Sequence, residues 1–204
     1  MSLEGTPSPE TLLWVLIATV LGEALAVGLI LVLAWRTPEG WGRLGWRRMA
    51  PRWLVRVAAV ELVVIAAGAT WAMWLSGKGL EGVSQDVARV FVRTGDPIAL
   101  GAAAILAILL APLFEEILFR GMLQSVFTVH FGSWAGIFMT AVVFGGMHLA
   151  EPLSVPPLIV LGLGAGWLRE ASGSLWPAVF LHVLNNFLAA GLSLASGVAV
   201  WGLI

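Results

Sequence analysis

Three short groups of polar residues stand inside strongly apolar parts of this chain, and their residue types suit hydrolytic chemistry. Glu115 and Glu116 are followed by Arg120, and His148 and His182 come later, each in its own apolar segment. A glutamate can take a proton from water, while a histidine can orient that water or stabilise a developing charge. An ionisable side chain at membrane depth costs roughly 2.5–3.5 kcal/mol on insertion scales, so each of these residues needs a reason.

Helical spacing indicates which of the first three side chains share a face. Glu116 and Arg120 are four residues apart with the acid first, so we predict an ion pair between them. Glu115 is turned by about 100° from Glu116, which leaves it free as a base. A purely structural ion-paired cluster is the alternative, although it leaves Glu115 unexplained.

Two further pairs with a spacing of four residues occur in the later segments. Phe144 precedes His148 by one helical turn, and His182 precedes Asn186 by the same distance. Asn185 offers a second amide, about 100° away on a helix. Each histidine alone is typical of a structural residue bonded to a carbonyl group. Three helices that each present such groups form a stronger constellation.

Other membrane hydrolases would leave different traces in the sequence. The chain has no cysteine, which excludes disulfides, thiolate metal sites and cysteine nucleophiles. Neither a Gly-x-Ser-Gly string nor a His-Glu-x-x-His string is present. Asp86 and Asp96 are the only aspartates, and both fall in a polar segment. Serine, metallo and aspartyl mechanisms of the known intramembrane types are therefore disfavoured, and glutamate, histidine and asparagine remain.

The three groups resemble the motifs of the CAAX prenyl protease and bacteriocin-processing family, also called the Abi family. The resemblance rests on Ala111-Pro112-x-x-Glu115-Glu116-x-x-x-Arg120-Gly121, Phe144-x-x-x-His148 and His182-x-x-x-Asn186, in the family's order and spacing. It implies a helical membrane fold with a polar cavity. It also implies that Glu115 and His148 activate water and that His182 and Asn186 stabilise the oxyanion. Supporting roles fall to Glu116, Arg120, Phe144 and Asn185.

Composition predicts the environment that must position these residues. Hydrophobic residues make up 59% of the chain and charged residues 11%, whereas soluble domains carry roughly 25% charged residues. We therefore predict an integral membrane protein. The first 35 residues contain no Lys or Arg, so we expect no cleavable signal peptide. Six of the eleven basic residues lie between Arg36 and Arg56, which predicts that this connection is cytoplasmic.

The apolar runs predict an all-α, polytopic bundle of about seven transmembrane helices, within a range of six to eight, since each span needs roughly 20 apolar residues. Pro112 makes the third run either one kinked helix or two short ones. Glu23 and Glu61, isolated on the first two spans, are expected to pair with Arg56 or to stay protonated. The predicted helices are 12–35, 53–75, 97–129, 134–149, 158–168 and 177–190, with short helices in 76–96 and 191–204 and turns at 130–133, 151–157 and 169–174.

The chain is interpreted as a single integral membrane domain, residues 1–204. Residues 1–96 hold two spans with basic and polar loops, and residues 97–190 form the catalytic core. We expect a multi-pass intramembrane endopeptidase of the bacterial cytoplasmic membrane, cleaving a membrane-associated or membrane-emerging peptide. A non-catalytic scaffold or immunity protein and a small transporter are the alternatives. The expected partners are a peptide substrate and the lipid bilayer, with no nucleic acid; the sequence sets neither the substrate nor the oligomeric state.

The expected mechanism needs no cofactor, with zinc as the alternative. If a metal is bound, Glu115, His148 and His182 are its ligands, since carboxylate and imidazole suit zinc. Against this, no two of them have the local spacing of a zinc motif, and Asn186 is a poor zinc ligand but a good amide donor.

Overall fold

The computed structural model describes residues 9–80, 101 and 104–196, and the regular elements among these residues are all helices, with no strand. The predicted short helix within 76–96 and the end of the C-terminal tail lie outside them. The helices are α1 (Pro9–Trp35), α2 (Gly40–Leu44), α3 (Arg52–Ser76), α6 (Ala111–Glu116), α7 (Gln124–Phe131), α8 (Ser133–Gly146), α9 (Val155–Ser172) and α10 (Trp176–Ser196). Two π-helical segments, η1 (Leu106–Leu110) and η2 (Ile117–Leu123), and one 3-10 turn, η3 (Pro152–Ser154), complete the set.

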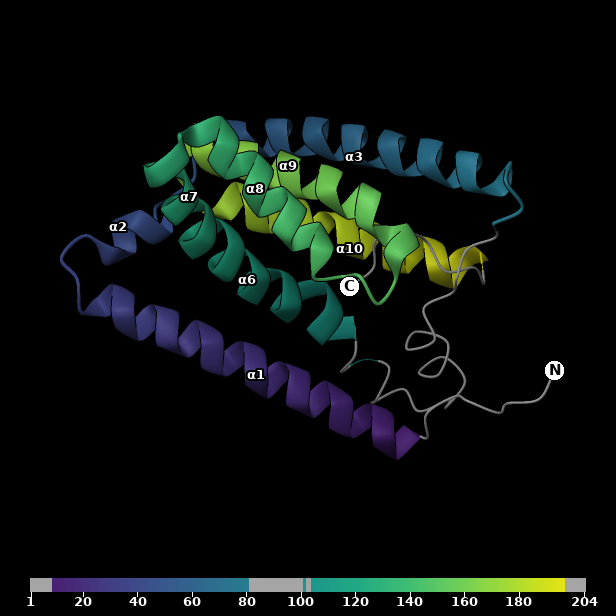
Figure 1. Cartoon of the computed structure of the whole chain (residues 1–204), viewed down its shortest axis with the longest axis horizontal. Coiled ribbons are helices and arrows are strands. Elements are labelled where there is room, and N and C mark those ends of the chain that lie inside the picture. Colours follow the sequence, from purple (N-terminus) through teal and green to yellow (C-terminus); the bar gives the residue numbers. More distant parts are fainter. Residues whose placement is uncertain (1–8, 81–100, 102–103, 197–204) are drawn as a thin grey trace.

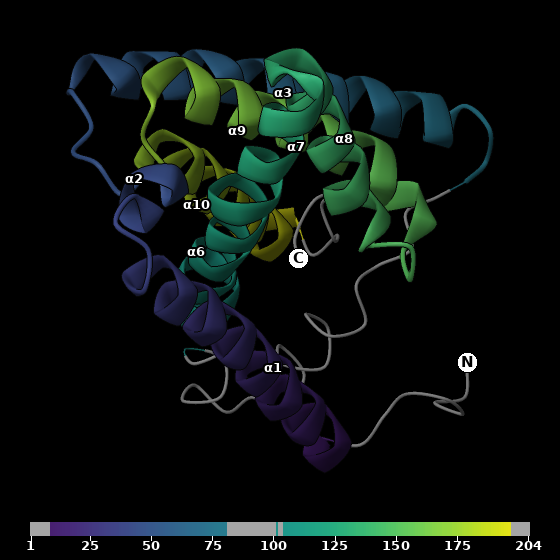
Figure 2. The same ribbon diagram turned by 60° about the vertical axis from the view of Figure 1, so that its left-hand side comes forward.

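Helices α1 and α3 form the two outer sides of the molecule, with α6 to α10 between them (Figures 1 and 2). Each is long and apolar enough to cross a membrane, over Ile17–Trp35 and Arg52–Ser76 respectively. Their apolar side chains are widely exposed, as at Leu25 (74%) and Val55 (73%), which fits contact with lipid. The all-α prediction is confirmed. In the described part of the chain, however, these two alone qualify as spans, and the 14-residue α8 is only about 21 Å long.

Residues 104–131 are helical without a break, so the predicted third segment is one helix rather than two. Pro112 lacks an N–H group, and its ring would collide with the carbonyl four residues earlier in a regular α-helix. The π-helical segment η1 ends just before this proline and widens the helix there. A second π-helical segment, η2, follows Glu116 directly. Such segments are frequent at functional sites.

Helix α9 is longer at both ends than the sequence predicts. It begins at Val155 and includes Pro156 and Pro157 in its first turn, where a missing N–H is tolerated because that group has no partner within the helix. It ends at Ser172, and Gly173 follows with a φ of 66°, a left-handed conformation that glycine adopts without strain. Residues 155–157 and 169–172 are therefore helical, and the two predicted turns are shorter than expected, at 151–154 and 173–174.

Two other boundaries also differ from the prediction, while one turn is confirmed. Helix α8 ends at Gly146 instead of residue 149, and α10 continues to Ser196 instead of giving way to a separate short helix. The predicted turn around Gly132 is present between α7 and α8, where this glycine has a φ of 85°.

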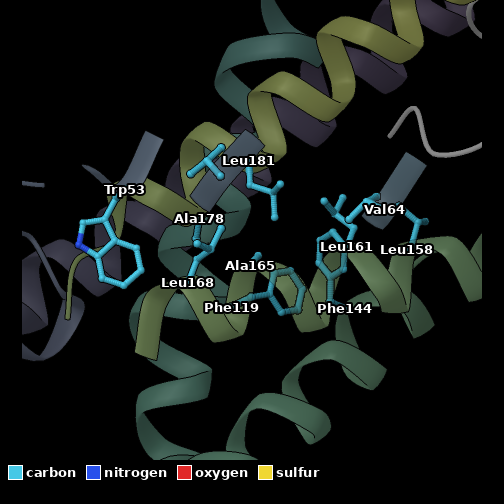
Figure 3. Close-up of a cluster of buried hydrophobic side chains, with 11 residues drawn as sticks. Trp53, Val64, Phe119, Phe144, Leu158, Leu161, Ala165, Leu168, Ala178 and Leu181 are labelled. Atoms are coloured by element: carbon cyan, nitrogen blue, oxygen red, sulfur yellow. The ribbon is translucent and has the colours of Figure 1, made fainter. Parts of the chain in front are cut away.

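Helix α9 lies at the centre of the bundle and touches neighbours through its glycines. A Cβ atom added to Gly162 would lie 3.0 Å from Ala141 of α8, and one added to Gly164 would lie 2.6 Å from Val60 of α3. These positions bring the backbones close together, as small residues do in membrane bundles. The main core formed in this way joins α3, η2, α8, α9 and α10 (Figure 3). Its buried members are Trp53, Val57, Val64, Phe119, Phe144, Leu158, Leu161, Ala165, Leu168, Ala178 and Leu181.

A second apolar cluster attaches α1 to the side of the bundle opposite α3. It contains Val27, Ile30, Ala34, Leu44, Ile117, Leu175 and Val179. Because Ile117 belongs to η2 and Val179 to α10, this cluster packs α1 against α10 and against the helix that carries the glutamate pair.

Two side chains from the helix of residues 104–131 bond to the backbone of α9. Arg120 donates from Nη2 to the carbonyl oxygen of Gly162 at 3.3 Å, and Gln124 donates from Nε2 to the carbonyl oxygen of Gly166 at 3.0 Å. Both bonds are buried and lie one turn apart on each helix. They fix the position of the glutamate pair along the axis of α9.

Candidate active site

Glu116 and Arg120 form the ion pair that their spacing predicts. Arg120 Nη1 lies 2.6 Å from Glu116 Oε1, and both side chains are fully buried. The guanidinium also lies 4.5 Å from the centre of the Phe144 ring, a distance at which an aromatic face attracts a cation. Glu116 is thus neutralised inside the bundle.

His182 reaches the same glutamate from α10. Its Nδ1 lies 2.9 Å from Glu116 Oε1, and Nδ1 must be the donor if a carboxylate oxygen accepts. The other ring nitrogen, Nε2, lies 3.8 Å from Glu115 Oε2. His182 is 3% exposed, so it faces the interior and not the lipid. One oxygen of Glu116 therefore links Arg120 to His182 and fixes the orientation of the imidazole ring.

Glu115 is left without a cation of its own, as its position on the helix predicts. It is half-buried, and its Oε2 accepts no hydrogen bond from the residues that the structure describes. Its neighbour Glu116 takes the arginine instead. Glu116 Oε2 likewise lacks a donor among the described residues, so the two carboxylates differ in the Oε1 of Glu116, which binds Arg120 and His182, while Glu115 lies no nearer than 3.8 Å to the histidine.

Asn186 lies one turn after His182 on α10 and is 1% exposed. Its Nδ2 donates to the carbonyl oxygen of Ala107 at 2.9 Å. In the π-helical pattern the Ala111 N–H bonds to Leu106, so the next donor, for Ala107, would come from Pro112, which has none. Asn186 supplies that missing donor, and its second N–H remains for another acceptor.

Phe144 and His148 complete the set of predicted residues. His148 lies in the turn after α8, and its Nδ1 lies 3.0 Å from the carbonyl oxygen of Phe144, so Nδ1 carries the hydrogen. The Phe144 ring contacts both histidines, with centroid distances of 5.3 Å to His148 and 5.5 Å to His182. The Phe144 ring therefore connects His148 to His182 by packing contacts. The convergence of Glu115, His148 and His182 on a single cavity stays a prediction.

Asn185 donates from Nδ2 to Asn186 Oδ1 at 3.4 Å. It therefore contacts the amide of its neighbour. Within the described ranges, no three histidine, aspartate or glutamate side chains are grouped closely enough to hold a metal ion.

Comparison with protein families bears directly on this cluster, because the matched region contains all three motifs. Residues 97–188 match the model of the family described as type II CAAX prenyl endopeptidase, Rce1-like. This stretch, 92 of the 204 residues, is similar to that family, and we call it the Rce1-like segment. The match confirms the resemblance to CAAX prenyl proteases, whose reaction class is peptide hydrolysis. No match was found among curated proteins or among solved structures.

One buried carboxylate near the cluster lies outside the Rce1-like segment. Glu61 on α3 is 3% exposed, and its electrostatic neighbours include His182. The expected partner Arg56 lies instead over the Trp53 ring, 4.3 Å from its centre. Both oxygens of Glu61 lack a hydrogen-bond donor in the described part of the structure. A signal was available in the sequence, since Val57 precedes Glu61 by one turn on the same buried face.

Glu23 on α1 approaches the Rce1-like segment from the other side. It is half-buried, and its electrostatic neighbours include Glu115. The cluster thus has one electrostatic neighbour on α1, where Glu23 interacts with Glu115, and one on α3, where Glu61 interacts with His182.

An apolar cavity of about 500 Å³ lies between α3 and α9. Its lining is Ala67, Thr70, Trp71, Trp74, Pro156, Pro157 and Val160. It shares no residue with the polar cluster, so the candidate active site is the cluster and not this cavity.

Proposed function

We propose that this chain is an intramembrane endopeptidase, a multi-pass protein of the bacterial cytoplasmic membrane that hydrolyses a membrane-associated or membrane-emerging peptide. The Rce1-like match supports the reaction class. Two long apolar helices with exposed hydrophobic surfaces support the location. The known eukaryotic members of the family cut prenylated tails, but most bacteria do not prenylate proteins, so the proposed substrate is a peptide without that group.

The observation that carries the proposal is the difference between the two adjacent glutamates. Glu116 is held by Arg120 at 2.6 Å and by His182 at 2.9 Å. Glu115 keeps Oε2 free of hydrogen bonds from described residues, 3.8 Å from the outer nitrogen of the same histidine. A purely structural ion cluster has no use for this second carboxylate, whereas a general base must be free to receive a proton.

The first step is the activation of water. Glu115 takes one proton from a water molecule while His148 presents Nε2 to that water and orients it. The Nδ1 hydrogen of His148 is engaged by the carbonyl group of Phe144, which leaves Nε2 as the nitrogen available to the water. The resulting hydroxide-like oxygen attacks the peptide carbonyl carbon.

The second step needs donors for the negative charge on the carbonyl oxygen. His182 presents Nε2 to that oxygen, and it donates there when both ring nitrogens carry hydrogen, because Nδ1 donates to Glu116. Asn186 donates with the N–H that Ala107 does not use. Each such donor contributes roughly 3 kcal/mol to transition-state stabilisation in other hydrolases. Glu115 then returns the proton to the leaving amine, which breaks the C–N bond and restores the enzyme.

The proposed scheme uses no metal, and a zinc enzyme is the second candidate. The Nδ1 hydrogen bond of His182 to a carboxylate would orient Nε2 toward a metal as well as toward an oxyanion. Exhaustive chelation of the purified protein separates the two schemes. We expect activity to survive chelation; loss of activity and recovery with one equivalent of zinc would refute the metal-free scheme.

The decisive experiment compares membrane proteomes of cells that carry the wild-type protein, Glu115→Gln or no protein. We expect new peptide C-termini in wild-type cells alone, since glutamine keeps the shape of the side chain and loses the base. Detergent-purified Glu115→Gln should unfold at the wild-type temperature. If Glu115→Gln restores every cellular phenotype of the wild type, the chain acts as a non-catalytic scaffold and the proposal is wrong.

A further inference from the structure

The connection between α1 and α3, which contains α2, carries much of the positive charge of the chain and lies at one end of the bundle (Figures 1 and 2). Between Arg36 and Arg56 the sequence has six arginines and one glutamate. That glutamate, Glu39, already pairs with Arg43 at 3.0 Å. The proposed peptidase mechanism uses none of these residues. The other arginines form a cationic surface, and no carboxylate of the described residues forms an ion pair with them.

The turn of residues 42–45, at the end of α2, is held in place by the helices behind it. Gly45 has a φ of 76°, and its carbonyl oxygen accepts the N–H of Leu175, just before α10, at 2.8 Å. Ser125 of α7 donates from Oγ to the carbonyl oxygen of Arg43 at 3.0 Å. A ligand that binds to this turn therefore does not have to order it first, which favours binding.

Two guanidinium groups pack against this turn. A Cβ atom added to Gly45 would lie 2.6 Å from Arg169 Cζ, and one added to Gly42 would lie 3.3 Å from Arg47 Nη2. Arg169 also donates from Nη2 to the carbonyl oxygen of Arg43 at 2.8 Å. The two glycines are joined by a hydrogen bond of 3.1 Å from the Gly45 N–H to the Gly42 carbonyl. Two like charges therefore share one turn, and Arg47 is an electrostatic neighbour of Arg169.

Neither of these two arginines forms an ion pair with a described carboxylate. Glu170 is the acidic neighbour of Arg169, but its Oε1 accepts a hydrogen bond from Ser133 Oγ at 2.6 Å. Arg169 Nε has no hydrogen-bond acceptor in the described part of the structure. Because like charges repel each other, an anion bound beside Arg47 and Arg169 would stabilise the folded protein.

Tryptophans beside the turn indicate where that anion comes from. Trp41 and Trp46 are each 40% exposed, and their ring centroids are 6.1 Å apart. Trp46 also lies 5.4 Å from the ring of Trp176, at the start of α10. Tryptophan is enriched at the interface between membrane and water, where the phosphate groups of phospholipids lie. Arginine binds phosphate with two parallel hydrogen bonds, so a lipid phosphate fits both the position and the chemistry.

We propose that Arg47 and Arg169 form a binding site for the headgroup phosphate of an acidic phospholipid on the turn of residues 42–45. Arg47 is exposed and supplies N–H donors, and the half-buried Arg169 adds a second positive charge on the same turn. A zwitterionic headgroup carries a cation of its own, which the two arginines repel, so an acidic headgroup is preferred. The site does not depend on the proposed peptidase activity.

The test measures thermal unfolding of the full-length protein in detergent micelles that contain increasing fractions of dioleoyl phosphatidylglycerol or dioleoyl phosphatidylcholine. A ligand that binds only the folded state raises the unfolding temperature. We expect phosphatidylglycerol to raise it and phosphatidylcholine to leave it unchanged. Arg47→Gln should need about tenfold more phosphatidylglycerol for the same rise, and Arg47→Lys, which keeps the charge, an intermediate amount. Arg52→Gln, an equal change of charge at an exposed position of α3, is the matched control and should behave like the wild type.

Four results would overturn the inference. No rise with phosphatidylglycerol would mean no site, and an equal rise with phosphatidylcholine would mean that the lipid chains bind instead of the headgroup. An equal rise with inorganic phosphate would assign the site to a free anion. Equal losses in Arg47→Gln and Arg52→Gln would mean diffuse attraction by the whole basic connection. Arg47 bonds to the rest of the fold through its backbone, so its variants should fold, and the readout requires no cleavage.

Discussion

Replacing Arg120 with methionine tests whether the buried ion pair holds the site together. The guanidinium has three interactions in the structure, with Glu116, with the carbonyl oxygen of Gly162 and with the Phe144 ring. Methionine fills much of the volume and offers none of them. The Glu116 carboxylate, whose side chain has no exposed surface, would then keep only His182 as a partner. Removing one member of a buried pair costs about 3–5 kcal/mol.

In a chain of this size, each kcal/mol shifts the unfolding temperature by about 2–4 °C, so we expect Arg120→Met to unfold about 6–20 °C below the wild type. The measurement is thermal unfolding of the purified proteins in one detergent, followed by a spectroscopic signal of helix content. The double variant Arg120→Met with Glu116→Gln removes the orphaned charge while an amide oxygen still accepts from His182. It should recover most of the lost stability.

The comparison of single and double variants is a double-mutant cycle, which isolates the energy that couples the two residues. Strict additivity of the two substitutions would show that Glu116 and Arg120 do not depend on each other. The reasoning would likewise be refuted if the free energy of unfolding of Arg120→Met lay within about 1 kcal/mol of the wild-type value. A loss that small is typical of a solvent-exposed ion pair.

Two further predictions follow from single positions. Asn186→Ala should lower kcat by roughly 10²- to 10³-fold with little change in KM, measured by steady-state cleavage; a change confined to KM would contradict its role as an oxyanion donor. Gly164→Ala should destabilise the fold by about 1–3 kcal/mol, since the new methyl group would meet Val60 at 2.6 Å. Gly68→Ala, with no atom within 4 Å of its added Cβ, should instead be neutral or stabilising, and equal unfolding temperatures for the two variants would count against the packing argument.

The polar centre of the site was predictable because few ionisable residues lie in apolar segments. Helical spacing then indicates which of these side chains share a face. The pair of Glu116 with Arg120 follows from the i, i+4 rule, and the structure has it at 2.6 Å. The freedom of Glu115 follows from the same helix geometry. These relations lie within one helix, where sequence distance determines spatial distance.

Contacts between different helices were harder to predict from the sequence. The bond from Asn186 to Ala107 arises from a π-helical turn that ends just before Pro112, and the sequence leaves open whether that proline kinks or divides the helix. The electrostatic proximity of Glu61 to His182 depends on the packing of α3 against α10, which no local pattern encodes. The prolines at the start of α9 are compatible with a loop and with the first turn of a helix. The sequence therefore predicts a start at residue 158, whereas α9 begins at Val155.

The two buried bonds from Arg120 and Gln124 to the backbone of α9 have a mechanical consequence. Their acceptors, Gly162 and Gly166, are spaced by four residues, as the donors are, so both bonds belong to one register. Sliding α9 by a fraction of a helical turn, whose pitch is about 5.4 Å, would break both bonds together and leave two buried donors unsatisfied. These two helices are therefore coupled against sliding, and under the proposed function we expect the opening for a peptide at another boundary of the bundle.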